Sequence, residues 1–192
     1  MRKTLARTLS ILGHPVFLVP ASATHVAIRS GASSAQLRTI WAILGTLMGI
    51  TLLFSTFMVK SGRWTHVDAV RREDRRTMNS TLLVLLLVPG LVLLRYESYR
   101  AVGLALSLGA GMVLVALLAG NLLKCSLHLA FGTFSVLLFR GQPAWIVGGL
   151  LFLAAVAWSR WELGRHTLRE LICGTLIGLV AGFCFHLALP GS

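Results

Sequence analysis

The segment from Ser159 to Glu170 holds the residue types that a phosphate-transfer site needs. His166 and Glu170 stand four residues apart, so on a helix the carboxylate could accept a hydrogen bond from one imidazole nitrogen and leave the other nitrogen to attack. A histidine oriented by an acid is the usual arrangement for a nucleophile or a base. Arg160 adds a planar donor fork that suits phosphate oxygens. The alternative is an interfacial loop whose arginines snorkel toward the membrane surface.

A second polar group, Lys124-Cys125-Ser126-Leu127-His128, stands at the start of an apolar block. Lys124 and His128 are i and i+4 neighbours, so on a helix both would face one site. Ser126 would add a hydroxyl near the positive N-terminus of that helix, where an anion is favoured. Ionisable residues at a membrane helix end are costly enough to indicate function, although such a pair taken alone is structural about as often.

A third segment, from Asp68 to Arg76, is strongly basic and holds four arginines within six residues. The interleaved Glu73 and Asp74 could hold some of the arginine side chains while others face a phosphate. The alternative is a basic loop that touches anionic lipid headgroups.

The composition of the chain indicates that all three polar segments belong to a membrane protein. Of the 192 residues, 56% are hydrophobic and 12% are charged, whereas soluble domains have about 45–50% and 25%. A membrane-spanning helix needs about 20 mostly apolar residues. We therefore expect one domain, residues 1–192, that is an all-α integral membrane bundle of six or seven transmembrane helices with its active site at one membrane face. The apolar blocks are residues 9–28, 37–59, 81–94, 101–119, 122–139, 144–158 and 171–189.

The first of these blocks has two interpretations. Basic residues precede it and Ala21-Ser22-Ala23 resembles a cleavage site, which is typical of a signal peptide. However, His14-Pro15 and Pro20 interrupt the apolar run. We therefore expect a retained helix or a partly inserted hairpin.

Glycine spacing indicates close helix packing near the end of the chain. Gly174, Gly178 and Gly182 repeat every four residues on the last block, a pattern that lets helix backbones approach closely. The alternative is that glycine is simply common in membrane helices.

The charged loops sort onto two sides of the membrane. With seven spans, the N-terminus and residues 60–80, 121–124 and 159–170 share one side, and with them all three polar segments. That side carries 13 of the 18 Lys and Arg residues, which favours the cytosol of a bacterial inner membrane. Six of the 13 are candidate phosphate ligands, and without them the count is seven against five. The net charge of +12 is explained by this bias and by anionic headgroups, so we expect no nucleic-acid partner.

The chemistry-bearing residues resemble the motifs of the type-2 phosphatidic acid phosphatase superfamily. The most specific of these motifs is Ser-Arg-x5-His-x3-Asp, which is matched with its spacing intact by Ser159, Arg160 and His166. Glu170 stands where the motif has aspartate, which keeps the charge and lengthens the side chain.

The other two motifs of that superfamily match less closely. Ser126 and His128 match Pro-Ser-Gly-His, in the Lys-x-Ser-x-His form of short bacterial relatives that Lys124 completes. For the Lys-x6-Arg-Pro motif, no Lys or Arg stands seven residues before an arginine of the basic segment and no proline follows it. The best substitutes are Arg72, Arg75 and Arg76.

This resemblance implies a phosphatase that acts in two steps without a metal or other cofactor. His166 would attack phosphorus to form a phosphohistidine, with Glu170 orienting its ring, and His128 would protonate the leaving group and then activate water. The charge on the phosphoryl oxygens would be stabilised by Arg160, Lys124, Ser126 and the basic-segment arginines. The substrate would be a lipid such as a polyprenyl phosphate or diphosphate, phosphatidic acid or phosphatidylglycerol phosphate.

Two other functions are compatible with the same residues. The departures from the first two motifs fit a non-catalytic lipid-binding or transport protein with the same fold. A lipid phosphotransferase would share the site and differ only in what attacks the phosphohistidine. The sequence does not choose among the lipid substrates, nor does it indicate an oligomeric state.

Overall fold

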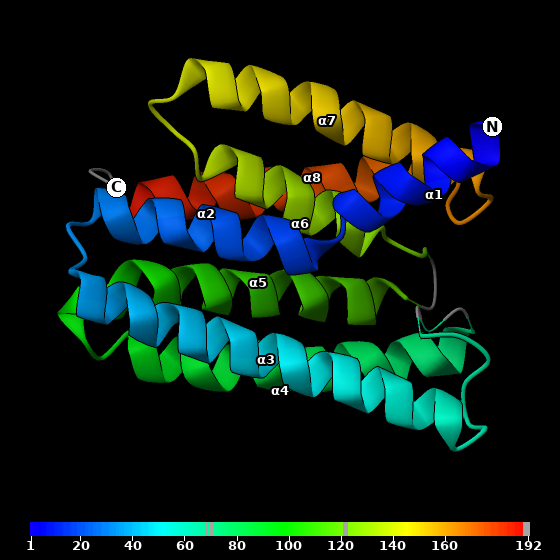
Figure 1. Ribbon diagram of the computed structural model, residues 1–192, viewed down its shortest axis with the longest axis horizontal. Coiled ribbons are helices and arrows are strands. Elements are labelled where there is room, and N and C mark those ends of the chain that lie inside the picture. The colour runs from blue at the N-terminus through cyan, green and yellow to red at the C-terminus, as the bar shows by residue number, and fades with distance from the viewer. Residues whose placement is uncertain (68, 70, 121–122, 190–192) are drawn as a thin grey trace.

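Every regular element among the described residues of the computed structural model is a helix (Figure 1). The structure describes residues 1–67, 69, 71–120 and 123–189, so Asp68 of the basic segment lies outside the described residues. The helices are α1 (Arg2–Leu12), α2 (Pro15–Arg29), α3 (Ser34–Lys60), α4 (Arg72–Leu93), the short 3₁₀ helix η1 (Glu97–Tyr99), α5 (Arg100–Ala119), α6 (Leu127–Leu137), α7 (Pro143–Glu162) and α8 (Leu168–Ala188).

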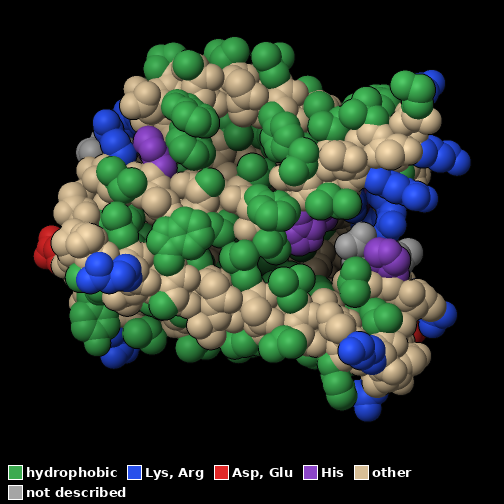
Figure 2. Space-filling view, viewed as in Figure 1, with side chains coloured by type: hydrophobic (Ala, Val, Ile, Leu, Met, Phe, Trp, Pro, Cys, Tyr) green, Lys and Arg blue, Asp and Glu red, His purple; other side chains and the backbone are tan. Residues whose placement is uncertain are grey.

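Six stretches of the described chain are long and apolar enough to cross a membrane. Two of them join neighbouring elements: residues 2–29 contain α1 and α2, and residues 97–119 contain η1 and α5. Large apolar side chains are exposed along these helices, among them Leu53, Trp145 and Phe183. Figure 2 shows apolar side chains over the middle of the molecule and Lys and Arg at its two ends. This distribution is compatible with an integral membrane protein.

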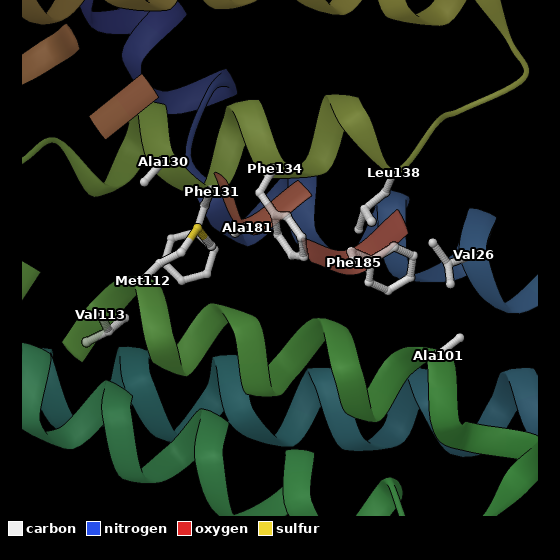
Figure 3. Packing of buried hydrophobic residues seen from close by; sticks show 10 residues of the cluster. All are labelled: Val26, Ala101, Met112, Val113, Ala130, Phe131, Phe134, Leu138, Ala181 and Phe185. Carbon is white, nitrogen blue, oxygen red and sulfur yellow. The ribbon is translucent and has the colours of Figure 1, made fainter. Parts of the chain in front are cut away.

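The core forms where α5, α6 and α8 meet (Figure 3). Phe131 and Phe134 of α6 pack with Phe185 of α8 and Val113 of α5, all of them buried. The short helix α6 packs against α2, α5, α7 and α8, and all but one of its residues from Leu129 onward are buried. Because α6 lies in the middle of the bundle, its packing helps to fix the positions of these four helices.

Glycines on α8 allow its backbone to touch α6. A Cβ atom at Gly174 would overlap the carbonyl oxygen of Ser126, and one at Gly178 would overlap the carbonyl oxygen of Ala130. The spacing of these glycines therefore marks a real helix contact, and the two backbones approach too closely for any larger residue.

Two of the helix boundaries differ from those predicted. The helix α4 begins at Arg72 instead of near residue 81, because arginine and glutamate are good helix formers and the negative charges of Glu73 and Asp74 suit a helix N-terminus. The helix predicted at 122–139 is only α6, from Leu127 to Leu137. It starts late because the Ser126 N–H donates to the carbonyl of Glu170 at 3.1 Å, which ties the preceding residues to another segment.

The first apolar block is two consecutive helices, not one helix or a hairpin. Gly13 ends α1, and His14 caps α2 with its Nδ1 accepting the Val16 N–H at 3.2 Å. Pro15 follows at the first helical position, where its missing N–H costs no hydrogen bond. Ala23 and Val26 of α2 are buried in the core, so this block is a packed part of the bundle.

The chain reversals gather the three polar segments at one end of the molecule. In Figure 1 the N-terminus, the α3–α4 connection, the residues before α6 and the α7–α8 turn all lie at the right-hand end. Most of the Lys and Arg side chains visible in Figure 2 lie at the same end.

We expect Gly178→Ala to lower the free energy of unfolding by about 1–3 kcal/mol, because the new methyl group would collide with the α6 backbone. Gly148→Ala on α7 is the matched control, since a Cβ atom there meets no neighbour within 4 Å. Thermal unfolding in detergent would compare the two variants. Equal stabilities would contradict the α6–α8 contact.

Candidate functional site

A cavity of 270 Å³ opens among the three polar segments. Its polar wall contains one lysine and three arginines and, among the described residues, no carboxylate. The rest of its wall is apolar and comes from α2, from the segment before α4 and from the middle of α3, α4, α5 and α6, including Val19, Leu44, Leu82 and Phe131. A cavity with this lining suits a ligand that has an anionic head and an apolar body. The polar lining residues are His14, Thr51, Arg75, Asn79, Lys124, His128, Arg160, Arg165 and His166.

His166 is held by Glu170 in the way that the sequence predicts, but by a different local structure. The Nδ1 atom of His166 lies 3.1 Å from Glu170 Oε2. His166 precedes α8 and is not a helical neighbour of Glu170. The two meet because Thr167 caps α8 and its N–H donates to the same Oε2 at 3.0 Å, in a capping box with Glu170.

The hydrogen bond to Glu170 decides which nitrogen of His166 can react. A carboxylate only accepts hydrogen bonds, so Nδ1 carries the proton and Nε2 of the neutral ring holds a lone pair. Burial, followed by the positive charges of Lys124, Arg160, Arg75 and Arg165, lowers the pKa of His166 to about 3. The contact with Glu170 is therefore a hydrogen bond between a neutral ring and a carboxylate at neutral pH. A neutral imidazole whose second nitrogen holds a free lone pair can act as a nucleophile.

Arg160 is buried and fixed from two directions. Its Nη1 donates to Ser10 Oγ of α1 at 2.9 Å. Its carbonyl accepts the N–H groups of Arg165 at 3.0 Å and His166 at 3.3 Å. These bonds link the guanidinium at the end of α7 to the turn that carries His166. Ser159 is also buried, but its hydroxyl donates to the Val156 carbonyl at 2.7 Å, so it has a structural role.

Lys124 connects the second polar group to the α7–α8 turn. Its Nζ donates to the Arg165 carbonyl at 2.6 Å. Burial, with Arg75 nearby, lowers the pKa of Lys124. The prediction that Lys124 and His128 are helical neighbours is wrong, because α6 begins only at Leu127. Both side chains nevertheless line the cavity, as Lys124 reaches it from the extended segment and His128 from the first turn of α6.

Ser126, which we predicted as a phosphate ligand, lies behind the cavity wall. It is fully buried, and its hydroxyl makes no hydrogen bond with the described residues. Its neighbours Cys125 and Leu127 line the cavity, but Ser126 does not. The N–H of Ser126 binds the Glu170 carbonyl, so in this structure the residue joins the two polar segments.

One arginine of the basic segment reaches the cavity. Because α4 begins at Arg72, residues 75, 78, 79, 82, 85 and 86 share one helical face, and all six line the cavity. Arg75 is half-buried on this face. Arg72 and Arg76 are exposed and lie outside the described lining, so two of the three predicted ligands are not brought to the site.

Among the histidines and arginines that line the cavity, two had no predicted role. His14 lies against His128, with ring centroids 4.9 Å apart and ring planes at 89°. In the sequence, His14-Pro15 interrupts an apolar block and also resembles the short bacterial relatives of the phosphatase superfamily, but the sequence predicts no role for it. Arg165 lies beside His166 on the α7–α8 turn and is half-buried, and its place directly before the motif histidine is the signal that could have identified it.

The comparisons with known proteins give no family. The chain matches no protein-family model, no curated protein and no solved structure. Among the described residues, no three His, Cys, Asp or Glu side chains are grouped so that they could hold a metal ion.

We expect Arg75→Gln to weaken binding of inorganic phosphate or vanadate about 10- to 100-fold, because a hydrogen bond to a charged group contributes about 1.5–3 kcal/mol. Arg76→Gln is the matched control on the exposed side of the same helical turn, and we expect it to change binding less than about twofold. Calorimetric titration of the detergent-solubilised protein measures both. Equal losses would contradict the assignment of Arg75 to the site.

Proposed function

We propose that this protein is a lipid-phosphate phosphatase of the type-2 phosphatidic acid phosphatase superfamily that acts through a phosphohistidine. One observation carries the proposal. The neutral His166, oriented by Glu170, faces a cavity that is lined by four cations and continues into an apolar chamber. Such a reaction needs a nucleophile, positive charges that stabilise the phosphoryl oxygens, and an apolar wall that can hold the lipid chain.

The spatial arrangement of the motif residues supports the family assignment. The N–H of Ser126 in the second motif donates to the carbonyl of Glu170 in the third. Lys124 donates to the carbonyl of Arg165, which lies between Arg160 and His166. Both bonds join residues 41 or more apart in the chain. Such long-range contacts are not a consequence of local sequence spacing. Four of the predicted site residues line the same cavity with Arg75: His128, His166, Arg160 and Lys124.

In the first step, His166 Nε2 attacks the phosphorus of the bound lipid phosphate. The P–N bond forms as the P–O bond to the lipid breaks, and the electron pair of that bond goes to the leaving oxygen. His128 gives this oxygen its proton. Burial, followed by the charge of Arg160, lowers the pKa of His128 well below its usual range, and a phosphate dianion bound beside the ring opposes that shift and favours the protonated form. The positive charges of Arg75, Arg160 and Lys124 stabilise the charge on the remaining phosphoryl oxygens.

In the second step, water attacks the phosphohistidine. His128, now neutral, takes a proton from the water as its oxygen bonds to phosphorus. The P–N bond breaks, its electron pair returns to Nε2, and inorganic phosphate leaves. The hydrogen bond from Nδ1 to Glu170 holds the ring in the same orientation through both steps.

The proposed substrate is an amphiphile whose phosphate lies at the membrane surface. Polyprenyl phosphates or diphosphates, phosphatidic acid and phosphatidylglycerol phosphate all have this form. The polar end of the cavity coincides with the end of the bundle where Lys and Arg gather (Figure 2). By the positive-inside rule this end faces the cytosol of a bacterial inner membrane.

The test is phosphate release from a panel of these lipids by the detergent-purified protein, with EDTA present. We expect wild-type protein to release phosphate and His166→Ala to lose at least about 10³-fold in rate, because the nucleophile is removed. His66→Ala is the matched control, since His66 is exposed and lies outside the described lining.

Each other outcome identifies a different function. A folded wild-type protein that binds these lipids and releases no phosphate would be a binding or transport module. Transfer of phosphate to a second lipid instead of water would identify a phosphotransferase. Release that stops in EDTA would contradict the metal-independent reaction.

A further inference from the structure

We infer that His14, at the junction of α1 and α2, is a positioning residue that holds the ring of His128 in the orientation for proton transfer. The inference rests on the proposed function, in which His128 is the general acid. It assigns a role in the reaction to the N-terminal helices, which carry none of the three motifs.

The contact between the two histidines is specific. Their ring centroids are 4.9 Å apart and their planes are at 89°, the edge-to-face geometry that aromatic pairs prefer. His14 cannot turn freely, because its Nδ1 accepts the Val16 N–H at the start of α2. A ring fixed in this way restricts the rotation of the ring that it touches.

The junction that carries His14 is itself fixed against α7. Gly13 packs on Val156, and a Cβ atom at Gly13 would overlap the methyl groups of that valine. One turn earlier, Ser10 accepts the hydrogen bond from Arg160. Pro15 then starts α2 with a restricted backbone angle. The α1–α2 junction therefore positions one charged ligand and one histidine of the cavity at the same time.

This arrangement explains why an apolar block is interrupted by a histidine and a proline. His14 lines the cavity together with His128 and His166. As a general acid, His128 must point one ring nitrogen at the leaving oxygen. The helix α6 fixes the backbone of His128 but does not by itself fix the orientation of the side chain. The neighbouring ring supplies the missing constraint on its side-chain torsions.

The test compares two substrates that differ in their need for a general acid. One is a long-chain alkyl phosphate, whose alkoxide is a poor leaving group unless it is protonated. The other is a nitrophenyl phosphate carrying a chain of the same length, whose phenolate leaves without a proton. The ratio of the two rates, measured in one sample, is independent of the fraction of protein that is folded.

We expect His14→Asn to lower the alkyl-to-aryl rate ratio about 10- to 100-fold, within the range that general acid catalysis contributes. Asparagine is a good helix N-cap, so α2 keeps its start while the ring is removed. In His14→Phe an aromatic ring still lies against His128 but lacks the hydrogen bond that fixes it, so we expect the ratio to fall less than in His14→Asn.

His25→Asn is the matched control. It makes the same change on the same helix, where His25 packs against Phe139 with ring centroids 4.6 Å apart, outside the described cavity lining. Its ratio should equal that of wild type. An unchanged ratio in His14→Asn, or an equal fall in His25→Asn, would overturn the role of His14 while the phosphatase activity of wild type stands. Wild-type protein that hydrolyses neither substrate would overturn the proposed function and this inference with it.

Discussion

The backbone of α6 lies directly against α8, with Gly174 and Gly178 leaving no side chain between them. This close approach brings the residues before α6 to the start of α8, where the Ser126 N–H binds the Glu170 carbonyl and Lys124 Nζ binds the Arg165 carbonyl. His128 and His166 line one cavity because of these contacts. A larger residue at Gly174 or Gly178 would push α8 away from α6. It would thereby move His128 and His166 apart without contacting either histidine.

The charges that line the cavity favour an anionic ligand. Four cations line it, and Glu170 lies behind His166, outside the described lining. Positive charges gathered in a partly buried space repel one another, and a bound phosphate relieves that repulsion. The same charges, with burial, keep His166 neutral. In the proposed reaction, the same charges would therefore attract phosphate and keep His166 in its neutral, nucleophilic form.

The sequence predicts the elements better than it predicts how they meet. Apolar runs at 37–59, 101–119, 144–158 and 171–189 correspond to α3, α5, α7 and α8. The pairing of His166 with Glu170 is present, although a capping box produces it instead of a helical turn. The glycine spacing on the last block marks a real contact. These features depend on short stretches of chain, so local patterns carry the information.

The remaining features depend on contacts between distant segments. Ser126 is the residue before α6, and its N–H binds the Glu170 carbonyl, so the late start of this helix depends on a segment more than 40 residues away. Arg75 is selected over Arg72 and Arg76 by where α4 begins and which face it buries. His14 meets His128 across 114 positions of the sequence, and only the packing of α1 and α2 on the rest of the bundle brings them together.

The covalent intermediate separates a phosphatase from a lipid-binding protein most directly. Wild-type protein mixed with a lipid carrying ³²P-phosphate and quenched within milliseconds should hold the label on His166, as a bond that is stable in alkali and cleaved in acid. His166→Ala should hold none. Phosphate release from the lipid with the label on Ser126, or with equal rates in wild type and His166→Ala, would contradict the histidine mechanism.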